Sequence, residues 1–368
     1  MHALKNLELV DLHVVRELLI PSLQKLVLIN MPSLECCSGL TASTVQMSTS
    51  QRDTEWLSGL RELTIHDCPC LVLPCPLPPS ALMSRFSIKG IPTHPTMEKK
   101  YGFSIKSGEL IMLDDKILAF HNLRGIGSLF IKDCPNLVSI SREGLNQFID
   151  LEGLYITGCP NFTMTSGLVL PSLRSLSVQA CAISGSWLME MLSHVRSLDS
   201  LVLYYCVQIK FISFSQPAAI EGASSLGSVA KHTDSDEQLL KIPSNISRRV
   251  LYISNCPDLE LGGEEGALRG YTSLEFIKVQ GCPKLVPLLV NGKMEVGSLP
   301  LSLQSLNIDM GPELSTGART GLEQGGNQVP PPPPSLDRLH ITNLTDKVQS
   351  RLLSFLPTIT ELVISGSP

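Results

Sequence analysis

A nine-residue pattern recurs along this chain, with apolar residues at its first, fourth and sixth positions and frequently a cysteine at its ninth. Clear copies are LRELTIHDC (60–68), LEGLYITGC (151–159) and LEFIKVQGC (274–282). Ten further copies begin at residues 4, 23, 83, 126, 173, 198, 248, 303, 336 and 359, and the commonest spacings are 22 to 26 residues. Thirteen copies predict a repeat architecture, and this period is typical of leucine-rich repeats.

The alternation inside each copy predicts one short β-strand. Leu154 and Ile156 would point to one side of such a strand, and Tyr155 to the other. Because a single strand cannot bury its apolar side alone, neighbouring copies are expected to stack as a parallel sheet. We therefore predict an α/β solenoid over residues 1–368 as a single domain. It would be an irregular leucine-rich repeat horseshoe, with a parallel β-sheet on the concave face and mostly loop or short helix on the convex face.

Three segments interrupt the repeats. Residues 41–55 are polar, residues 212–245 are Ser-rich and acidic, and residues 311–335 pass from a Gly-rich stretch into five prolines. We predict inserted surface loops at all three, with polyproline II over the prolines acting as a spacer or, alternatively, as a ligand for an aromatic groove. A weakly matching copy is expected around GELIML (108–113).

Seven cysteines occupy the ninth position of the pattern: Cys68, Cys134, Cys159, Cys181, Cys206, Cys256 and Cys282. Metal binding would need ligands that converge on one ion, and only Cys68, Cys70 and Cys75 are grouped in sequence. Disulfides between neighbouring strands are compatible with the distance between strands, but equivalent side chains point the same way. Other copies carry Gly, Leu or Ser here, so we interpret the thiol as a small packing residue at a bend. The proline that often follows is expected to end the strand.

Composition and motifs exclude several classes of function. The formal charge of -5 and the lack of a basic cluster argue against nucleic acid as a partner. No signal peptide and no apolar run long enough for a membrane span is present, which favours a cytoplasmic protein; sequons at Asn161, Asn245 and Asn343 are weak evidence to the contrary. Phosphate-loop, dinucleotide-binding and nucleophile-elbow motifs are absent from the sequence, so we expect no enzyme activity, no cofactor and no metal.

Function is then expected on the outward positions of the predicted strands, where aromatic and Arg side chains are the usual anchors of protein interfaces. The alternative for each ring is that it merely stacks on its cross-strand neighbour. The predicted partner-binding residues are Arg61, Glu62, His66, Phe130, Lys132, Tyr155, Arg174, Gln179, Tyr204, Tyr252, Phe276, Lys278, Arg338 and His340.

The segments LRELTIHDCP, GSLFIKDCPNL, LEGLYITGCPNF and LPSLRSL resemble the C-terminal leucine-rich repeats of plant intracellular nucleotide-binding immune receptors. The resemblance covers essentially the whole chain and implies a sensor that binds a pathogen effector, a host protein or the nucleotide-binding part of a receptor. The sequence contains no phosphate loop or coiled coil, so ATP binding and signalling are not implied. We expect a receptor segment or a truncated, non-signalling fragment with poor solubility in isolation. A substrate adaptor of a ubiquitin ligase is the alternative, although that class favours a steadier period and an F-box.

Overall fold

The computed structural model describes residues 4–19, 23–38, 59–163, 167–195, 198–214, 238–242, 249–261, 274–285, 300–309, 336–342 and 359–366. The chain divides into two compact units, residues 1–170 and 171–368. The predicted loops at 41–55 and 311–335 lie outside the described residues. The prediction of a single domain stays a prediction.

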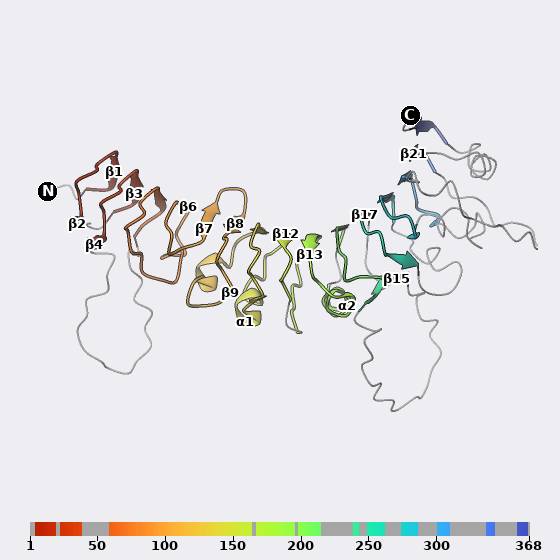
Figure 1. Ribbon diagram of the computed structural model, residues 1–368, viewed down its shortest axis with the longest axis horizontal. Helices are drawn as coiled ribbons and strands as arrows, with labels where there is room; N and C mark the ends of the chain where they lie inside the picture. The colour runs from red at the N-terminus through yellow and green to blue at the C-terminus, as the bar shows by residue number, and fades with distance from the viewer. Residues whose placement is uncertain are drawn as a thin grey trace, which may run out of the picture. The chain divides into compact units, whose positions relative to one another are not determined.

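Unit 1 is built around one ladder of short strands (Figure 1). In spatial order these are β1 (Asn6–Val10), β3 (Lys25–Ile29), β5 (Glu62–His66), β6 (Arg85–Lys89), β7 (Thr96–Lys99), β8 (Phe103–Lys106), β10 (Ser128–Lys132) and β12 (Gly153–Cys159). The connecting segments carry β2 (Glu17–Leu19) paired with β4 (Cys36–Ser38), and β9 (Met112–Leu113) paired with β11 (Ser139–Ile140). They also carry a 3-10 helix, η1 (Phe120–Leu123), and one turn of helix, α1 (Arg142–Leu145).

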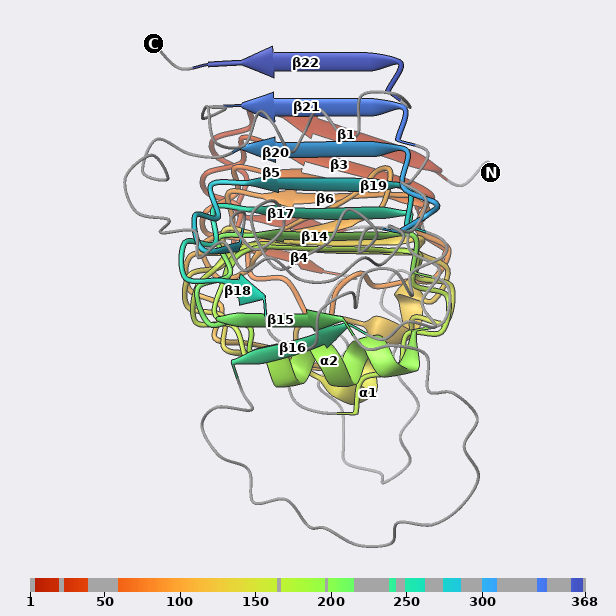
Figure 2. The same ribbon diagram turned by 90° about the vertical axis from the view of Figure 1, so that its right-hand side faces the viewer.

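Unit 2 contains a second run of parallel strands, and Figure 2 shows those from β14 to β22 lengthwise, one above another. The run is β13 (Ser175–Cys181), β14 (Ser200–Tyr204), β17 (Val250–Ser254), β19 (Phe276–Gln280), β20 (Ser305–Asp309), β21 (Arg338–Thr342) and β22 (Glu361–Ser365). A small sheet of β16 (Leu239–Ile242), β15 (Phe211–Phe214) and β18 (Glu260–Leu261) lies apart from it, and helix α2 (Gly185–His194) packs against β16. The sequence analysis predicted a loop over residues 212–245. Strand β15 covers the start of this range and β16 lies near its end, so the loop prediction is wrong for those residues.

The strands form because the pattern alternates, as predicted. Leu154 and Ile156 are fully buried, and in register beside them Leu129 and Ile131 are buried too. Each of the thirteen predicted copies contains one strand of these ladders, and the inward side chains form an almost entirely aliphatic core. The described part of the chain is therefore mostly parallel β-sheet with few helices. Among the described residues no helix is long and apolar enough to cross a membrane.

One strand breaks the parallel arrangement. Strand β7 runs antiparallel to both β6 and β8, and β8 then pairs in parallel with β10. The strand that fills the gap between predicted copies is thus FSIK (103–106) rather than GELIML, which instead supplies β9 on the connecting side. The expected sheet is therefore not parallel throughout. Burial explains the change, because Phe103 and Ile105 are fully buried and Phe103 stacks on Phe86 with ring centroids 6.0 Å apart.

In ten of the copies that the structure describes, the chain turns at or near the end of the strand at a residue in the left-handed region of backbone conformation. This residue, at the eighth position of the pattern, has a positive φ in Asp11, Asn30, Asp67, Gly90, Asp133, Gly158, Ala180, Tyr205, Asn255 and Gly281. Its N–H donates to the carbonyl that ends the neighbouring strand, as from Asp133 to Thr157 at 2.8 Å and from Asn255 to Gln280 at 2.8 Å. Asp, Asn and Gly adopt this conformation most readily, which explains their frequency at this position. The cysteine and proline follow the turn rather than make it.

The seven cysteines after this turn are buried, and none of them forms a disulfide. Each Sγ donates to the carbonyl two residues earlier, for example Cys181 to Gln179 at 3.1 Å and Cys134 to Lys132 at 3.3 Å. A thiol is a weak donor that otherwise packs as a small apolar group, so it suits a buried position beside a strand-end carbonyl. This agrees with its interpretation as a packing residue.

Candidate protein-binding face

In the ladder strands that belong to the repeated pattern, the side chains at the first, third and fifth strand positions project from the side of the sheet opposite the core; in β8 the corresponding residues are Ser104 and Lys106. We call this side the open face. Strand register aligns equivalent positions, so that Phe130 lies beside Ser104 on β8 and beside Tyr155 on β12. Because consecutive side chains of a strand point to opposite faces, the open face is a direct product of the alternating sequence.

The strongest feature of the open face in unit 1 is an aromatic stack. The rings of Phe130 and Tyr155 lie 4.6 Å apart between centroids, with an angle of 11° between their planes. Both side chains are half-buried rather than exposed. The predicted alternative, that these rings stack on each other, is therefore correct for this pair, but their outer surfaces still line the face.

Two glycines that the sequence analysis did not single out make room for the stack. A Cβ atom on Gly153 would come within 2.6 Å of Cε2 of Tyr155, so the ring folds back over its own strand. A Cβ atom on Gly102 would lie 2.6 Å from the carbonyl oxygen of Ser128 and 2.9 Å from Cε2 of Phe130. All three distances are shorter than real Cβ contacts. For Gly153, its place two residues before the outward Tyr155 is the signal that could have predicted this arrangement.

Lysine side chains border the aromatic stack. Nζ of Lys132 lies 4.8 Å from the centroid of the Phe130 ring, within the range of a cation–π contact. On the adjacent β8, Lys106 makes an ion pair of 2.7 Å with Asp133, and this hydrogen bond raises the pKa of the exposed Lys106. The face therefore places cationic groups directly beside polarisable rings.

The predicted residues of β5 lie elsewhere on the face of unit 1. Nε2 of His66 lies 2.8 Å from Oγ of Ser87, and burial together with nearby Lys89 lowers the pKa of this imidazole. Glu62 occupies the first outward position of β5, and Arg61 is exposed just before the strand. Strands β6, β7 and β8 separate these residues from Phe130, so the structure does not bring the two groups together.

In unit 2 the predicted residues form smaller clusters. Nζ of Lys278 lies 4.9 Å from the ring centroid of Tyr252, which is directly opposite it in register. Phe276 is half-buried at the first outward position of the same strand, β19. Tyr204 packs edge-on against Tyr205, with ring centroids 5.0 Å apart.

Two more predicted residues belong to β13 and the residue before it. Gln179 donates to Oγ of Ser177 at 2.9 Å, on the open face. Arg174 is exposed just before β13 and reaches Asp199 at 3.7 Å. Exposed ion pairs of this kind contribute little to stability.

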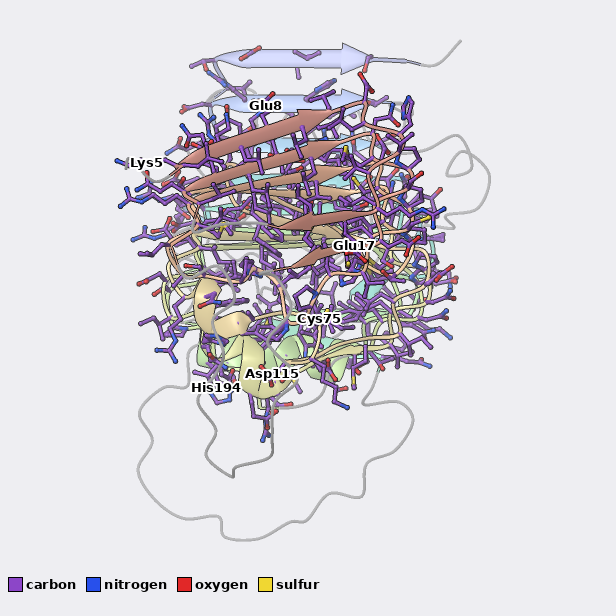
Figure 3. The ribbon with its side chains drawn as sticks, turned by 90° about the vertical axis from the view of Figure 1, so that its left-hand side faces the viewer. Lys5, Glu8, Glu17, Cys75, Asp115 and His194 are labelled. Atoms are coloured by element: carbon purple, nitrogen blue, oxygen red, sulfur yellow. The ribbon has the colours of Figure 1, made fainter. Side chains whose placement is uncertain are left out.

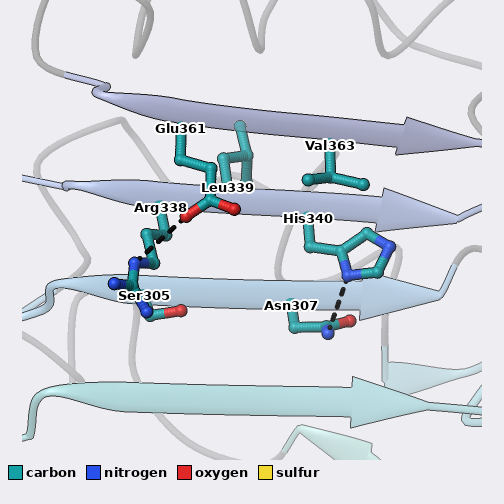
Figure 4. A pocket seen from close by; sticks show the side chains of 7 residues that line it. All are labelled: Ser305, Asn307, Arg338, Leu339, His340, Glu361 and Val363. Atoms are coloured by element: carbon teal, nitrogen blue, oxygen red, sulfur yellow. Dashed lines mark hydrogen bonds and ion pairs between the residues drawn. The ribbon is translucent and has the colours of Figure 1, made fainter.

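Arg338 and His340 line a shallow depression of about 160 Å³ over β20, β21 and β22 (Figure 4). Nδ2 of Asn307 lies 3.2 Å from Nδ1 of His340, and Arg338 pairs with Glu361 at 3.2 Å. Oδ1 of Asn307 is buried and has no hydrogen-bond partner among the described residues.

The described residues do not suggest metal or nucleophile chemistry on this face. Among them no group of three or more His, Cys, Asp or Glu side chains is close enough to hold a metal ion. The loose cysteine group from the sequence does not converge, because Cys68 is buried against the carbonyl of His66 whereas Cys75 contacts His94. Comparison of the sequence with known protein families gives no match, and no curated protein matches it either.

Proposed function

We propose that the chain is a protein-recognition module, the leucine-rich repeat portion of a plant innate-immune receptor. Its open face, the predicted concave side, binds a pathogen effector or a host protein. The resemblance of its LxxLxIxxCP segments to that class of receptor supports the assignment. The outward side chains of neighbouring strands line up in register, and together they form a continuous surface on which a protein can bind.

The observation that carries the proposal is the Phe130–Tyr155 stack. Aromatic rings on a solvent-facing sheet have no core to fill, and here two glycines leave the space in which they lie flat. A flat ring pair held in one orientation loses little conformational entropy when a partner covers it, which is the behaviour of an interface anchor. Lys132 beside the rings adds a group that can pair with an acidic or carbonyl-bearing partner side chain.

The proposal is tested by screening the protein against a library of effectors and host proteins from a plant. Each binder is then tested again with Tyr155→Ala and with Tyr101→Ala. Tyr101 is a matched control because it is a tyrosine of the neighbouring β7–β8 turn whose side chain is 90% exposed and is not one of the two stacked rings. We expect binders that Tyr155→Ala loses and Tyr101→Ala retains. If every binder from the screen binds Tyr155→Ala as well as it binds the wild type, the proposal is contradicted.

A further inference from the structure

Outside the open face, the structure brings one cysteine and one histidine together. Sγ of Cys75 lies 3.2 Å from Nε2 of His94. Cys75 belongs to the connection between β5 and β6, and His94 follows β6. Cys75 is exposed and His94 is half-buried, so the pair is open to small solutes. Figure 3 shows Cys75 on the side of unit 1 that carries the connecting segments, away from Glu8 on β1.

Backbone hydrogen bonds hold both partners in place. Two residues after Cys75, Leu77 donates to the carbonyl of Ile117 at 2.9 Å and accepts from Ala119 at 2.8 Å. Leu77 itself is fully buried. The backbone N–H of His94 donates to the carbonyl of Ile91 at 3.1 Å, closing a turn. The contact between thiol and imidazole therefore rests on anchored segments.

A third residue orients the imidazole. Nδ1 of His94 lies 2.8 Å from Oγ1 of Thr93. If Nδ1 carries the ring proton and donates it to this hydroxyl, the lone pair of Nε2 faces the thiol of Cys75. A nucleophile in contact with a base that a third group orients is the arrangement of an activated side chain.

The environment keeps this pair neutral at rest. Burial raises the pKa of the Cys75 thiol. Burial also lowers the pKa of His94 below its ordinary value of 6.5, and the carbonyl of Leu73 only partly opposes this. At neutral pH the thiol is therefore protonated while the imidazole is free to accept its proton, so the pair suits general-base assistance rather than a resting thiolate.

We propose that Cys75 is a modification site, a thiol that hydrogen peroxide oxidises to sulfenic acid with His94 as the general base. The sulfur attacks one peroxide oxygen, so that an S–O bond forms as the O–O bond breaks. The thiol proton passes to Nε2 of His94 and from there to the departing oxygen, which leaves as water. The sulfur loses two electrons and the peroxide gains them, giving Cys–SOH and one water from Cys–SH and one peroxide.

The other cysteines of the chain can be compared with Cys75. Cys70 is also exposed and lies five residues before Cys75, but no hydrogen bond joins its thiol to any residue that the structure describes. The seven turn cysteines are buried and donate to their own strand carbonyls, Cys37 is buried as well, and Cys36 is only partly exposed. Cys75 should therefore be the first thiol of the folded protein to react.

The experiment treats the folded full chain with hydrogen peroxide at pH 7, traps sulfenic acid with dimedone and measures the labelling rate of each cysteine by mass spectrometry. We expect Cys75 to label roughly tenfold faster than Cys70 or more, and His94→Gln to remove most of that advantage, as loss of a general base should. Thr93→Val should give an intermediate rate. Circular dichroism and thermal unfolding establish that each variant is folded.

A measurement on the unaltered protein keeps the proposal testable if His94→Gln fails to fold. The labelling rate of Cys75 should fall as pH drops through the depressed pKa of His94, below 6.5, and be level above it until the thiol itself ionises. A rate that only follows ionisation of the thiol would overturn the proposal. So would a Cys75 rate no higher than that of Cys70, or a folded His94→Gln variant that labels like the wild type.

Discussion

The ring of Tyr155 on β12 lies flat against the ring of Phe130 on β10, with 11° between the two planes. The two residues are direct partners in the strand register. The stack therefore joins two copies of the sequence pattern, and it does so on the solvent side of the sheet, where a partner can reach it.

This stack predicts coupling between the two side chains. Removing either ring by Phe130→Ala or Tyr155→Ala should lower the free energy of unfolding. The double variant should lose less of that free energy than the two single variants lose together. We expect a coupling free energy of about 0.5–1.5 kcal/mol from a double-mutant cycle measured by urea unfolding. Additive losses would show that the rings do not stabilise each other.

Gly153 should be required only while the Tyr155 ring is present. An added Cβ would lie 2.6 Å from Cε2 of that ring, so Gly153→Ala should destabilise the wild-type chain. In a Tyr155→Ala background Gly153→Ala should lower the free energy of unfolding much less, because the ring that the added Cβ would meet is gone. Gly127→Ala is the control, since no atom lies within 4 Å of the Cβ it would add. Equal costs for Gly153→Ala in both backgrounds would refute the proposed role.

Tyr205 has a backbone conformation that is unfavourable for a tyrosine. Its φ is 53°, in the left-handed region that bulky residues avoid, and its side chain is 48% exposed. Asn255 occupies the equivalent turn of the next copy, so Tyr205→Asn should stabilise the chain by roughly 0.5–1 kcal/mol despite losing the contact with Tyr204. Thermal unfolding measures this, with Asn255→Tyr expected to destabilise. A lower melting temperature for Tyr205→Asn would indicate that packing outweighs backbone strain.

The buried thiol of Cys37 predicts a weakening of the fold at alkaline pH. Burial, assisted by the neighbouring Cys36 and Cys68, raises the pKa of Cys37 to about 12 from an ordinary value of 9.0. Above pH 9 the unfolded chain loses this proton first, so the stability contributed by the neutral thiol is complete below pH 9 and is lost as the pH rises towards 12. The free energy of unfolding should fall less steeply over this range in Cys37→Ala than in the wild type or in Cys70→Ala. Identical slopes would contradict this explanation.

The sequence predicted the ladder because the alternation of apolar residues determines which side of each strand is buried. Leu154 and Ile156 lie in the core, and Tyr155 points the other way, as expected. The strand around Phe103 was missed because its segment lacks the leading apolar positions and is preceded by a strand of reversed direction. Tertiary burial of Phe103 against Phe86, which no local pattern encodes, decides that arrangement.

The candidate site was predicted less completely. Alternation placed Phe130 and Tyr155 on one face, but their stacking depends on Gly102 and Gly153, whose effect is visible only in three dimensions. The turn residue before each cysteine was overlooked for a different reason. The Cys-Pro pair is recognisable in the sequence because the same residue types recur. Asp133, Gly158 and Asn255 have different side chains and share only a backbone conformation, which a sequence pattern does not show.

We propose that the open face binds a partner protein through the Phe130–Tyr155 stack. The most direct test is a calorimetric titration of a partner from the screen into the wild type, Tyr155→Ala and Tyr101→Ala, each first shown to be folded. For an interface anchor we predict a dissociation constant about 30-fold weaker for Tyr155→Ala, corresponding to about 2 kcal/mol, and no change for Tyr101→Ala. Unchanged affinity of Tyr155→Ala, or an equal loss in both variants, would contradict the account.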